Sequence, residues 1–152
     1  MTLTQKENSL LSDLKSQEQL CIDKYGKYAE EACDPALKSL FSEIKSTEQK
    51  HLETINRILS GEEVAMATCP VAVAEKKRFT PSSCPADAKQ RDAFFCKDAL
   101  AMEKHVSSVY DTSVFEFSSP TLRDTLAHIQ KEEQNHGQRL YSYLSCNNAT
   151  PA

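Results

Sequence analysis

The sequence predicts an all-α protein built as a four-helix bundle, and three observations support this class. Only three of the 152 residues are glycine, while Glu, Lys, Gln, Ala and Leu are frequent, a composition that favours helix over sheet. Apolar residues recur at spacings of three and four along four segments. The two halves of the chain also match each other without a gap at an offset of 85 residues. We therefore expect residues 1–152 to form one domain of two similar helical hairpins.

The first hairpin is expected over residues 4–61. Thr4 followed by Glu7 has the form of a capping box, so the first helix is predicted to begin there. Asp34 and Pro35 suit the N-cap and the first position of a second helix. That helix is predicted to end near Gly61.

The second hairpin is expected over residues 87–146 and repeats the first. Asp87 with Gln90 resembles a helix cap, and Ser119-Pro120 restarts the chain as Asp34-Pro35 does. Between the hairpins, residues 62–86 lose the helical pattern and contain three of the six prolines. A loop of this length is uncommon unless it has a purpose, and it suffices to cross a helix of about 40 Å. We predict a crossover along the outside of the bundle that makes the second and third helices parallel.

Charge and hydropathy exclude several classes of partner. The net charge is −4 and no dense basic run is present, so we expect no nucleic acid partner. No apolar run approaches the ~20 residues that span a bilayer, and we expect no membrane partner. The first seven residues lack the apolar centre of a signal peptide, which favours a cytoplasmic protein.

Six cysteines are present, and none forms a Cys-x-x-Cys pair, which argues against a zinc ribbon or a thioredoxin-like site. We expect mostly reduced, buried thiols. Cys69 and Cys84 are exceptions because each precedes a proline in the loop, and for these two a disulfide or a cross-linking role stays open.

Six titratable side chains lie on the apolar stripes of the four helices: Glu18, Glu48, His51, Glu103, Glu133 and His136. Burial of four carboxylates without compensation is implausible, whereas divalent cations would neutralise them. Each Glu-x-x-His pair lies on one helix face. In each hairpin the solitary Glu and the Glu of the pair lie about 21–24 Å from the same turn, so the half-sites meet at mid-height if the crossover puts the two turns at opposite ends. A solvated polar face with accidental symmetry, or a duplication that lost its metal, are the alternatives. His105 and His128 lie off the stripes and are expected at the surface.

With one Glu from each of two helices and Glu-x-x-His from the other two, the sequence resembles the ferritin-like superfamily, bacterioferritin and rubrerythrin relatives in particular. The resemblance implies two iron or two manganese ions. Glu48 and Glu133 would bridge both, Glu18 and His51 would complete one ion's shell, and Glu103 and His136 the other's. Oxygen and imidazole ligands suit either metal.

Tyr25 and Tyr110 follow the solitary glutamates by seven residues, where this superfamily often has a tyrosine. The resemblance implies that each hydroxyl hydrogen-bonds a ligand carboxylate of a neighbouring helix. Simple core packing is the alternative for both.

Local sequence also resembles the spore coat F-like (Coat F domain) proteins of spore-forming Firmicutes, in Leu-Thr-Gln-Lys-Glu at residues 3–7 and in Asp-Pro-Ala-Leu-Lys-Ser-Leu-Phe at residues 34–41. This resemblance implies assembly into the spore coat with other coat proteins. Two functions follow: a di-metal oxidoreductase acting on O₂ or peroxide, with ferroxidase, peroxidase or catalase-like activity, or a non-enzymatic structural coat protein. Catalytic residues stay unassigned, and we expect a homodimer. Iron storage is a weaker option because residues 147–152 leave no room for a fifth helix, and a peroxidase would need an outside electron donor.

Overall fold

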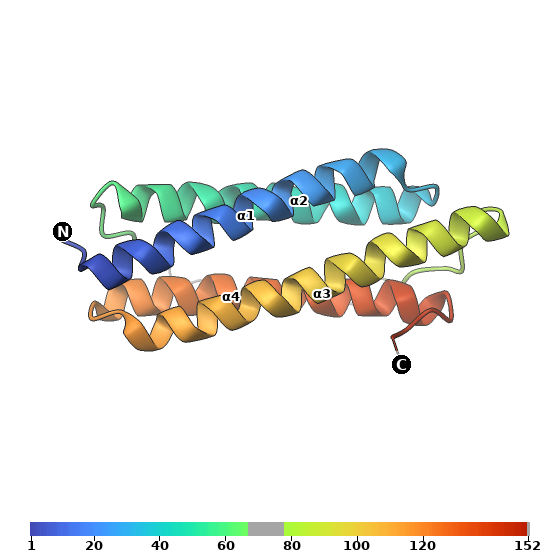
Figure 1. The fold of residues 1–152 in the computed structure, drawn as a ribbon. Coiled ribbons are helices and arrows are strands. Elements are labelled where there is room, and N and C mark those ends of the chain that lie inside the picture. Colours follow the sequence, from blue (N-terminus) through green and yellow to red (C-terminus); the bar gives the residue numbers. More distant parts are fainter. Residues whose placement is uncertain (67–77, 152) are drawn as a thin grey trace.

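The structure, a computed structural model, describes residues 1–66 and 78–151 and consists of four long helices in a bundle (Figure 1). The helices are α1 (Gln5–Glu31), α2 (Pro35–Leu59), α3 (Ala86–Glu116) and α4 (Pro120–Cys146), and the described residues contain no strand. α1 packs on α2 and α3 packs on α4 as two antiparallel hairpins, and the closest contact between hairpins is that of α1 with α3. The predicted all-α four-helix bundle is confirmed. None of the described helices is long and apolar enough for a bilayer crossing.

The first hairpin begins and turns where the sequence predicts. The Thr4 hydroxyl accepts a hydrogen bond from the Glu7 backbone N–H, and the Glu7 carboxylate accepts one from the Thr4 N–H at 2.8 Å, which is a complete capping box. Asp34 caps α2 by accepting from the Ala36 N–H at 2.9 Å. Gly61, just past the end of α2, has a φ of +94°, a left-handed conformation that glycine adopts without strain.

The second hairpin differs from the prediction at its start. Asp87 does not cap α3, because the helix already begins at Ala86 with Pro85 at the N-cap position and no side-chain cap. The Asp87 carboxylate instead lies in the first turn, where its negative charge interacts favourably with the helix dipole. Ser119 caps α4 as predicted and accepts from the Leu122 N–H at 3.3 Å.

The crossover joins opposite ends of the bundle, so that α2 and α3 run parallel as predicted (Figure 1). At its start, the carbonyl of Val64 accepts a 2.7 Å hydrogen bond from Thr125, near the beginning of α4. At its end, the Ser82 N–H donates at 2.9 Å to the side chain of Asn147, just past the end of α4. The predicted path along the outside of the bundle falls on residues 67–77, which lie outside the described residues.

A disulfide between Cys33 and Cys84 joins the α1–α2 turn to the end of the crossover, with the two Cα atoms 6.4 Å apart. The expectation of a reduced thiol was therefore wrong for Cys33, because the crossover returns to this turn and brings Cys84 against it. Cys21, Cys96 and Cys146 are free, and the first two are buried as expected. Cys69 lies outside the described residues.

Two buried carboxylates tie each hairpin to the turn of the other. Asp92 at the start of α3 accepts hydrogen bonds from the backbone N–H of Cys33 at 2.9 Å and of Asp34 at 2.8 Å. Glu7, its equivalent at the 85-residue offset, accepts from the Ser118 N–H at 3.1 Å in the α3–α4 turn. The repeat therefore includes the contacts that hold the hairpins in register.

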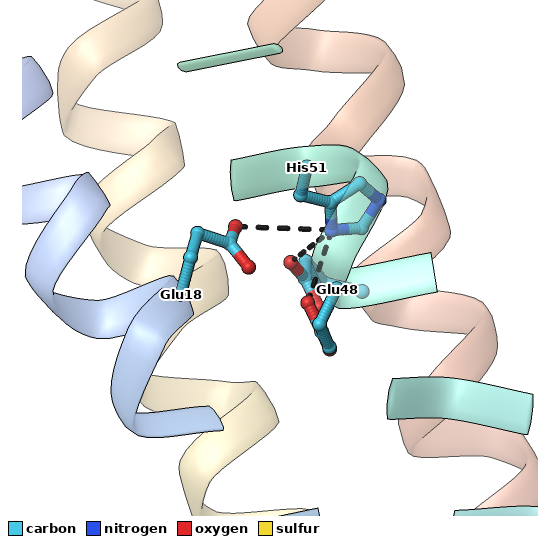
Figure 2. A group of neighbouring side chains, drawn as sticks. Glu18, Glu48 and His51 are labelled. Carbon is cyan, nitrogen blue, oxygen red and sulfur yellow. Dashed lines mark hydrogen bonds and ion pairs between the residues drawn. The ribbon is translucent and has the colours of Figure 1, made fainter. Parts of the chain in front are cut away.

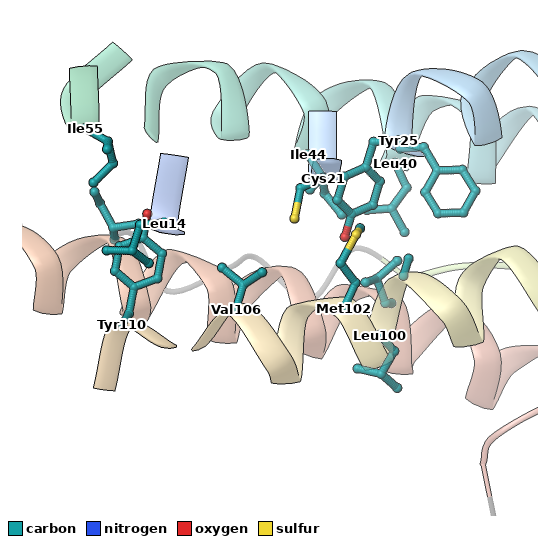
Figure 3. Packing of buried hydrophobic residues seen from close by; sticks show 14 of the residues in the cluster. Leu14, Cys21, Tyr25, Leu40, Ile44, Ile55, Leu100, Met102, Val106 and Tyr110 are labelled. Atoms are coloured by element: carbon teal, nitrogen blue, oxygen red, sulfur yellow. The ribbon is translucent and has the colours of Figure 1, made fainter. Parts of the chain in front are cut away.

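Apolar layers lie on both sides of the bundle's middle along the helix axes, at the left and at the right of Figure 3. Tyr25 packs beside Cys21, Leu40 and Met102 on one side, while Tyr110 lies near Leu14 on the other. All of these side chains are 9 % exposed or less. The middle of the bundle is thereby shielded along the helix axes, and burial at about 25 cal/mol per Å² of apolar surface stabilises the arrangement.

Candidate metal centre

All six side chains predicted as ligands converge near the middle of the four helices. α1 and α3 each contribute one solitary Glu, and α2 and α4 each contribute a Glu-x-x-His pair. Their exposed fractions are Glu18 0 %, Glu48 0 %, His51 1 %, Glu103 2 %, Glu133 1 % and His136 4 %. The alternative of a solvated polar face is excluded by this burial.

The first of two overlapping clusters consists of Glu18, Glu48, His51 and Glu133, whose ligand atoms all lie within 4.8 Å of one another. His51 Nδ1 is 3.0 Å from Glu48 Oε2, 3.1 Å from Glu133 Oε1 and 3.7 Å from Glu18 Oε1. Figure 2 shows Glu18 of α1 pointing toward His51 and Glu48 of α2. One imidazole nitrogen therefore faces carboxylates from three helices.

The second cluster consists of Glu48, Glu103, Glu133 and His136, again with ligand atoms within 4.8 Å of one another. His136 Nδ1 is 3.1 Å from Glu48 Oε1, 3.3 Å from Glu133 Oε2 and 3.5 Å from Glu103 Oε1. Glu48 and Glu133 belong to both clusters, and each turns one oxygen toward each imidazole. This is the arrangement that two carboxylates bridging a pair of cations require.

The buried oxygens of this centre are not satisfied by the protein. Four carboxylate oxygens, one from each glutamate, accept no hydrogen bond from the described residues: Glu18 Oε2, Glu48 Oε1, Glu103 Oε2 and Glu133 Oε1. A buried carboxylate oxygen without a partner costs several kcal/mol. Oxygen and imidazole donors of this kind suit iron and manganese, so the residues present fit a pair of such ions.

Without metal, the carboxyl groups divide into two kinds. Burial raises the pKa of Glu18 and of Glu103 well above the ordinary value. Burial also acts to raise the pKa of Glu48 and Glu133, but hydrogen bonds from the two imidazoles outweigh it and lower both. Glu48 and Glu133 therefore carry the negative charge of the metal-free centre.

The pKa values of the two imidazoles rise, whereas those of Glu48 and Glu133 fall. Burial acts to lower the pKa of His51 and His136, but the surrounding carboxylates outweigh it and raise both pKa values well above the ordinary one. Protons on the imidazoles thus take the place that cations would take. Metal ions at this centre must compete with those protons.

Both predicted tyrosines reach the centre, and each reaches the glutamate of the other hairpin. The Tyr25 hydroxyl of α1 donates to Glu103 of α3, and the Tyr110 hydroxyl of α3 donates to Glu18 of α1. Both tyrosines are 0 % exposed. These hydrogen bonds go to Oε1 of each glutamate and leave Oε2 without a hydrogen bond from the described residues, so they add a function beyond simple core packing.

Sequence reasoning missed one residue of the centre, Glu132. Its carboxylate accepts a hydrogen bond from His51 Nε2 at 2.7 Å, and its other oxygen lies 3.7 Å from Nε2 of His128. Glu132 precedes Glu133 and lies off the apolar stripe, so only its place beside a Glu-x-x-His pair pointed to it. His128 is half-buried, more than expected, whereas His105 is exposed as predicted.

Comparison with known proteins finds a family that resembles part of the chain. No curated protein and no solved structure matches it. Residues 91–148, which contain Glu103, Glu133 and His136 together with most of α3 and all of α4, match the Coat F domain. The sequence segments that first indicated this family, residues 3–7 and 34–41, lie outside the match. The match over the second hairpin agrees with the resemblance: residues 91–148 of this chain are similar to the Coat F domain.

Proposed function

We propose that this protein is a spore-coat protein of the ferritin-like kind that holds two iron or two manganese ions and turns over O₂ or peroxide. One observation carries the proposal: four buried carboxylate oxygens receive no hydrogen bond from the described residues, in two clusters that share Glu48 and Glu133. A pair of cations would satisfy these oxygens and neutralise the charge. The Coat F domain supports the assignment to the coat and to other coat proteins as partners.

Each residue of the centre has a role in this proposal. Glu48 and Glu133 would hold both ions, because each presents one oxygen to each half of the centre. Glu18 with His51, and Glu103 with His136, complete the two shells. A bound pair of ions supplies two-electron chemistry on O₂ or peroxide. Tyr25 and Tyr110 orient the terminal glutamates, and the apolar layers exclude bulk water.

The seam between α2 and α4 is the route by which small molecules reach the centre in this proposal. These two helices contact each other less than α1 contacts α3. Polar side chains cross between them, from His51 to Glu132 and from Arg139 to Glu43. His51 on one side is bonded to the half-exposed Glu132 on the other, so a polar contact connects the centre to the surface. O₂ and hydrogen peroxide are small enough for such a seam.

A structural role is the second candidate, and the Cys33–Cys84 disulfide favours it. This bond fixes the end of the crossover to the α1–α2 turn across 51 residues of sequence. A protein that is cross-linked and held together by metal suits a resistant layer. In this case the ions stabilise the bundle and no turnover takes place.

The test begins with the metal content of protein purified from cells grown with both iron and manganese. We expect about two ions per chain in the wild type and loss of the pair in a Glu48→Ala, Glu133→Ala double variant, because each bridging carboxylate serves both ions. Decay of hydrogen peroxide and aerobic oxidation of Fe(II) are then measured on the same samples. The exposed change Asp124→Asn on α4 serves as the control.

The outcomes separate the two candidates. Turnover in the wild type and in Asp124→Asn, but not in the folded double variant, supports the oxidoreductase. Two bound ions with background rates in all three proteins leave the structural role. Absence of bound iron and manganese from the folded wild type overturns both forms of the metal proposal. The homodimer is a separate prediction, which sedimentation of the same wild-type sample tests.

A further inference from the structure

The two halves of the centre are nearly identical around the inner nitrogens of the imidazoles. At the 85-residue offset, the distances from His51 Nδ1 to its three carboxylates are 3.0, 3.1 and 3.7 Å. The equivalent distances from His136 Nδ1 are 3.3, 3.1 and 3.5 Å. No pair differs by more than 0.3 Å (3.3 minus 3.0), so the inner ligands alone give no reason for the two halves to bind metal differently.

The surroundings of the outer imidazole nitrogens, Nε2 of His51 and Nε2 of His136, differ. His51 Nε2 bonds to the Glu132 carboxylate at 2.7 Å. The residue equivalent to Glu132 in the first half is Thr47, which has no charge and whose hydroxyl donates to the Glu43 carbonyl at 3.5 Å. The described carboxylates within ion-pair distance of His136 all face its Nδ1. A hydrogen-bonded carboxylate is thus added to one imidazole and not to its twin.

We propose that the two metal positions are inequivalent, and that Glu132 makes the position at Glu18 and His51 bind its ion more tightly than the position at Glu103 and His136. This inference rests on the proposed metal function and adds an order of occupancy to it. Glu132 is a positioning residue, because it acts through His51.

The physical reasons are two. A carboxylate that accepts from Nε2–H holds the tautomer whose Nδ1 lone pair is free for a cation, fixes the ring and increases its basicity. Glu132 also adds a negative charge one imidazole ring away from the ion. Removal of such a partner reduces metal affinity by about 10- to 100-fold in other metal sites. The position at His136 has neither advantage, and its imidazole is slightly more exposed, at 4 % against 1 % for His51.

The experiment isolates each position with a matched pair of variants, so that coupling between two bound ions does not disturb the comparison. Glu103→Gln leaves the His51 position intact, and Glu18→Gln leaves the His136 position intact. The two substitutions are equivalent, because the 85-residue repeat relates Glu18 to Glu103. Mn(II) affinity of each variant is measured by calorimetry and by the electron paramagnetic resonance of the unbound ion. We expect Glu103→Gln to bind Mn(II) at least about tenfold more tightly than Glu18→Gln.

Two further changes assign the difference to Glu132. Glu132→Gln should weaken binding about tenfold when added to Glu103→Gln and should have little effect when added to Glu18→Gln. Thr47→Glu, which copies the Glu132 carboxylate onto the other half, should strengthen binding in the Glu18→Gln background. Asp124→Asn is the charge control, since it removes an exposed carboxylate about two turns earlier on α4. Thr47→Glu keeps the test valid if Glu132→Gln fails to fold.

Equal Mn(II) affinities for Glu103→Gln and Glu18→Gln overturn the inference while the proposed function stands. An affinity difference that survives Glu132→Gln also overturns it, because another residue would then cause the difference. If the wild type itself takes up no Mn(II) and no Fe(II), the inference and the proposed function fall together.

Discussion

The Tyr25 hydroxyl on α1 donates a hydrogen bond to the Glu103 carboxylate on α3, and both groups are buried. The equivalent bond runs from Tyr110 on α3 to Glu18 on α1. Each solitary glutamate is therefore held by a tyrosine of the opposite hairpin. The pair of bonds couples the shape of the centre to the packing of the two hairpins.

This coupling predicts that Tyr25→Phe weakens both the fold and the metal centre. The lost hydrogen bond leaves a buried carboxyl oxygen unsatisfied, and the free energy of unfolding should fall by about 1–2 kcal/mol. Mn(II) affinity should fall about tenfold because Glu103 loses its orientation. Urea unfolding of metal-free protein and Mn(II) calorimetry measure the two effects. Tyr141→Phe, at a half-exposed site on α4, should change neither quantity. Unchanged values for Tyr25→Phe would mean that the tyrosine only fills space.

A second prediction concerns Glu18, whose pKa burial raises well above the ordinary value of 4.5. Burial therefore favours the protonated form of this carboxyl group in metal-free protein, and Glu18→Gln should imitate that form. At about pH 4.5, with chelator present, we expect the variant's free energy of unfolding to lie within about 1 kcal/mol of the wild type. The wild type should gain about 2.7 kcal/mol when free metal reaches a hundred times its dissociation constant. The variant lacks one ion's terminal ligand and should gain less.

The difference in stability between metal-free wild type and Glu18→Gln should depend on pH, and the raised pKa of Glu18 determines the direction. A carboxyl group with a raised pKa stabilises the folded state below its unfolded pKa, and this contribution is lost as the pH rises toward the folded pKa. Metal-free wild type should thus lose stability relative to Glu18→Gln as the pH rises above about 4.5. A variant that is strongly destabilised without metal, by about 3 kcal/mol or more, would indicate that Glu18 is ionised in the metal-free fold.

The third prediction concerns the disulfide, which closes a long loop between Cys33 and Cys84, 51 residues apart. Closure of a loop of this length restricts the unfolded chain and stabilises the fold by about 4 kcal/mol. Cys33→Ser with Cys84→Ser should reduce the free energy of unfolding by that amount, and a reducing agent should have the same effect on the wild type. Cys146→Ser removes a cysteine outside the bond and serves as the control. Equal stability with and without reductant would show that the two cysteines are not joined.

The repeat explains how much of this structure the sequence predicts. The stripes and the two X-Pro turns determine four helices, and the similar distances of Glu18 and Glu48 from the Asp34 turn place them at nearly the same height. These are local, periodic signals. The parallel direction of α2 and α3 follows from the length of the loop between them. A loop of this length is long enough to run from one end of the bundle to the other.

The features that the sequence does not predict arise from contacts between segments that are far apart in the chain. No periodic pattern marks the residues that make these contacts. Glu132 lies off the stripe, and only the packing of α4 against α2 brings it to His51. Cys33 meets Cys84 because the crossover returns to the first turn. The equivalence of Glu7 and Asp92 is hidden because the two residue types differ, although both accept hydrogen bonds from a turn.

The last prediction concerns Glu7, and it separates the fold from the metal centre. Hydrogen bonds from the backbone N–H of Thr4 and then of Ser118 lower the pKa of Glu7 below its ordinary value of 4.5. A carboxyl group with a lowered pKa stabilises the folded state above its unfolded pKa, and this contribution is lost as the pH falls through the folded pKa. Glu7→Gln should therefore cost about 2 kcal/mol at pH 7, because hydrogen bonds to a charged acceptor are lost. The deficit should shrink as the pH falls below about 4.5. Urea unfolding of chelator-treated protein at a series of pH values measures this deficit.

Asp13→Asn, which removes an exposed carboxylate from the same helix, is the control for Glu7→Gln and should leave the free energy of unfolding nearly unchanged at every pH. A deficit for Glu7→Gln that stays constant down to pH 3 would mean that packing, and not the charge of Glu7, holds the α3–α4 turn against α1.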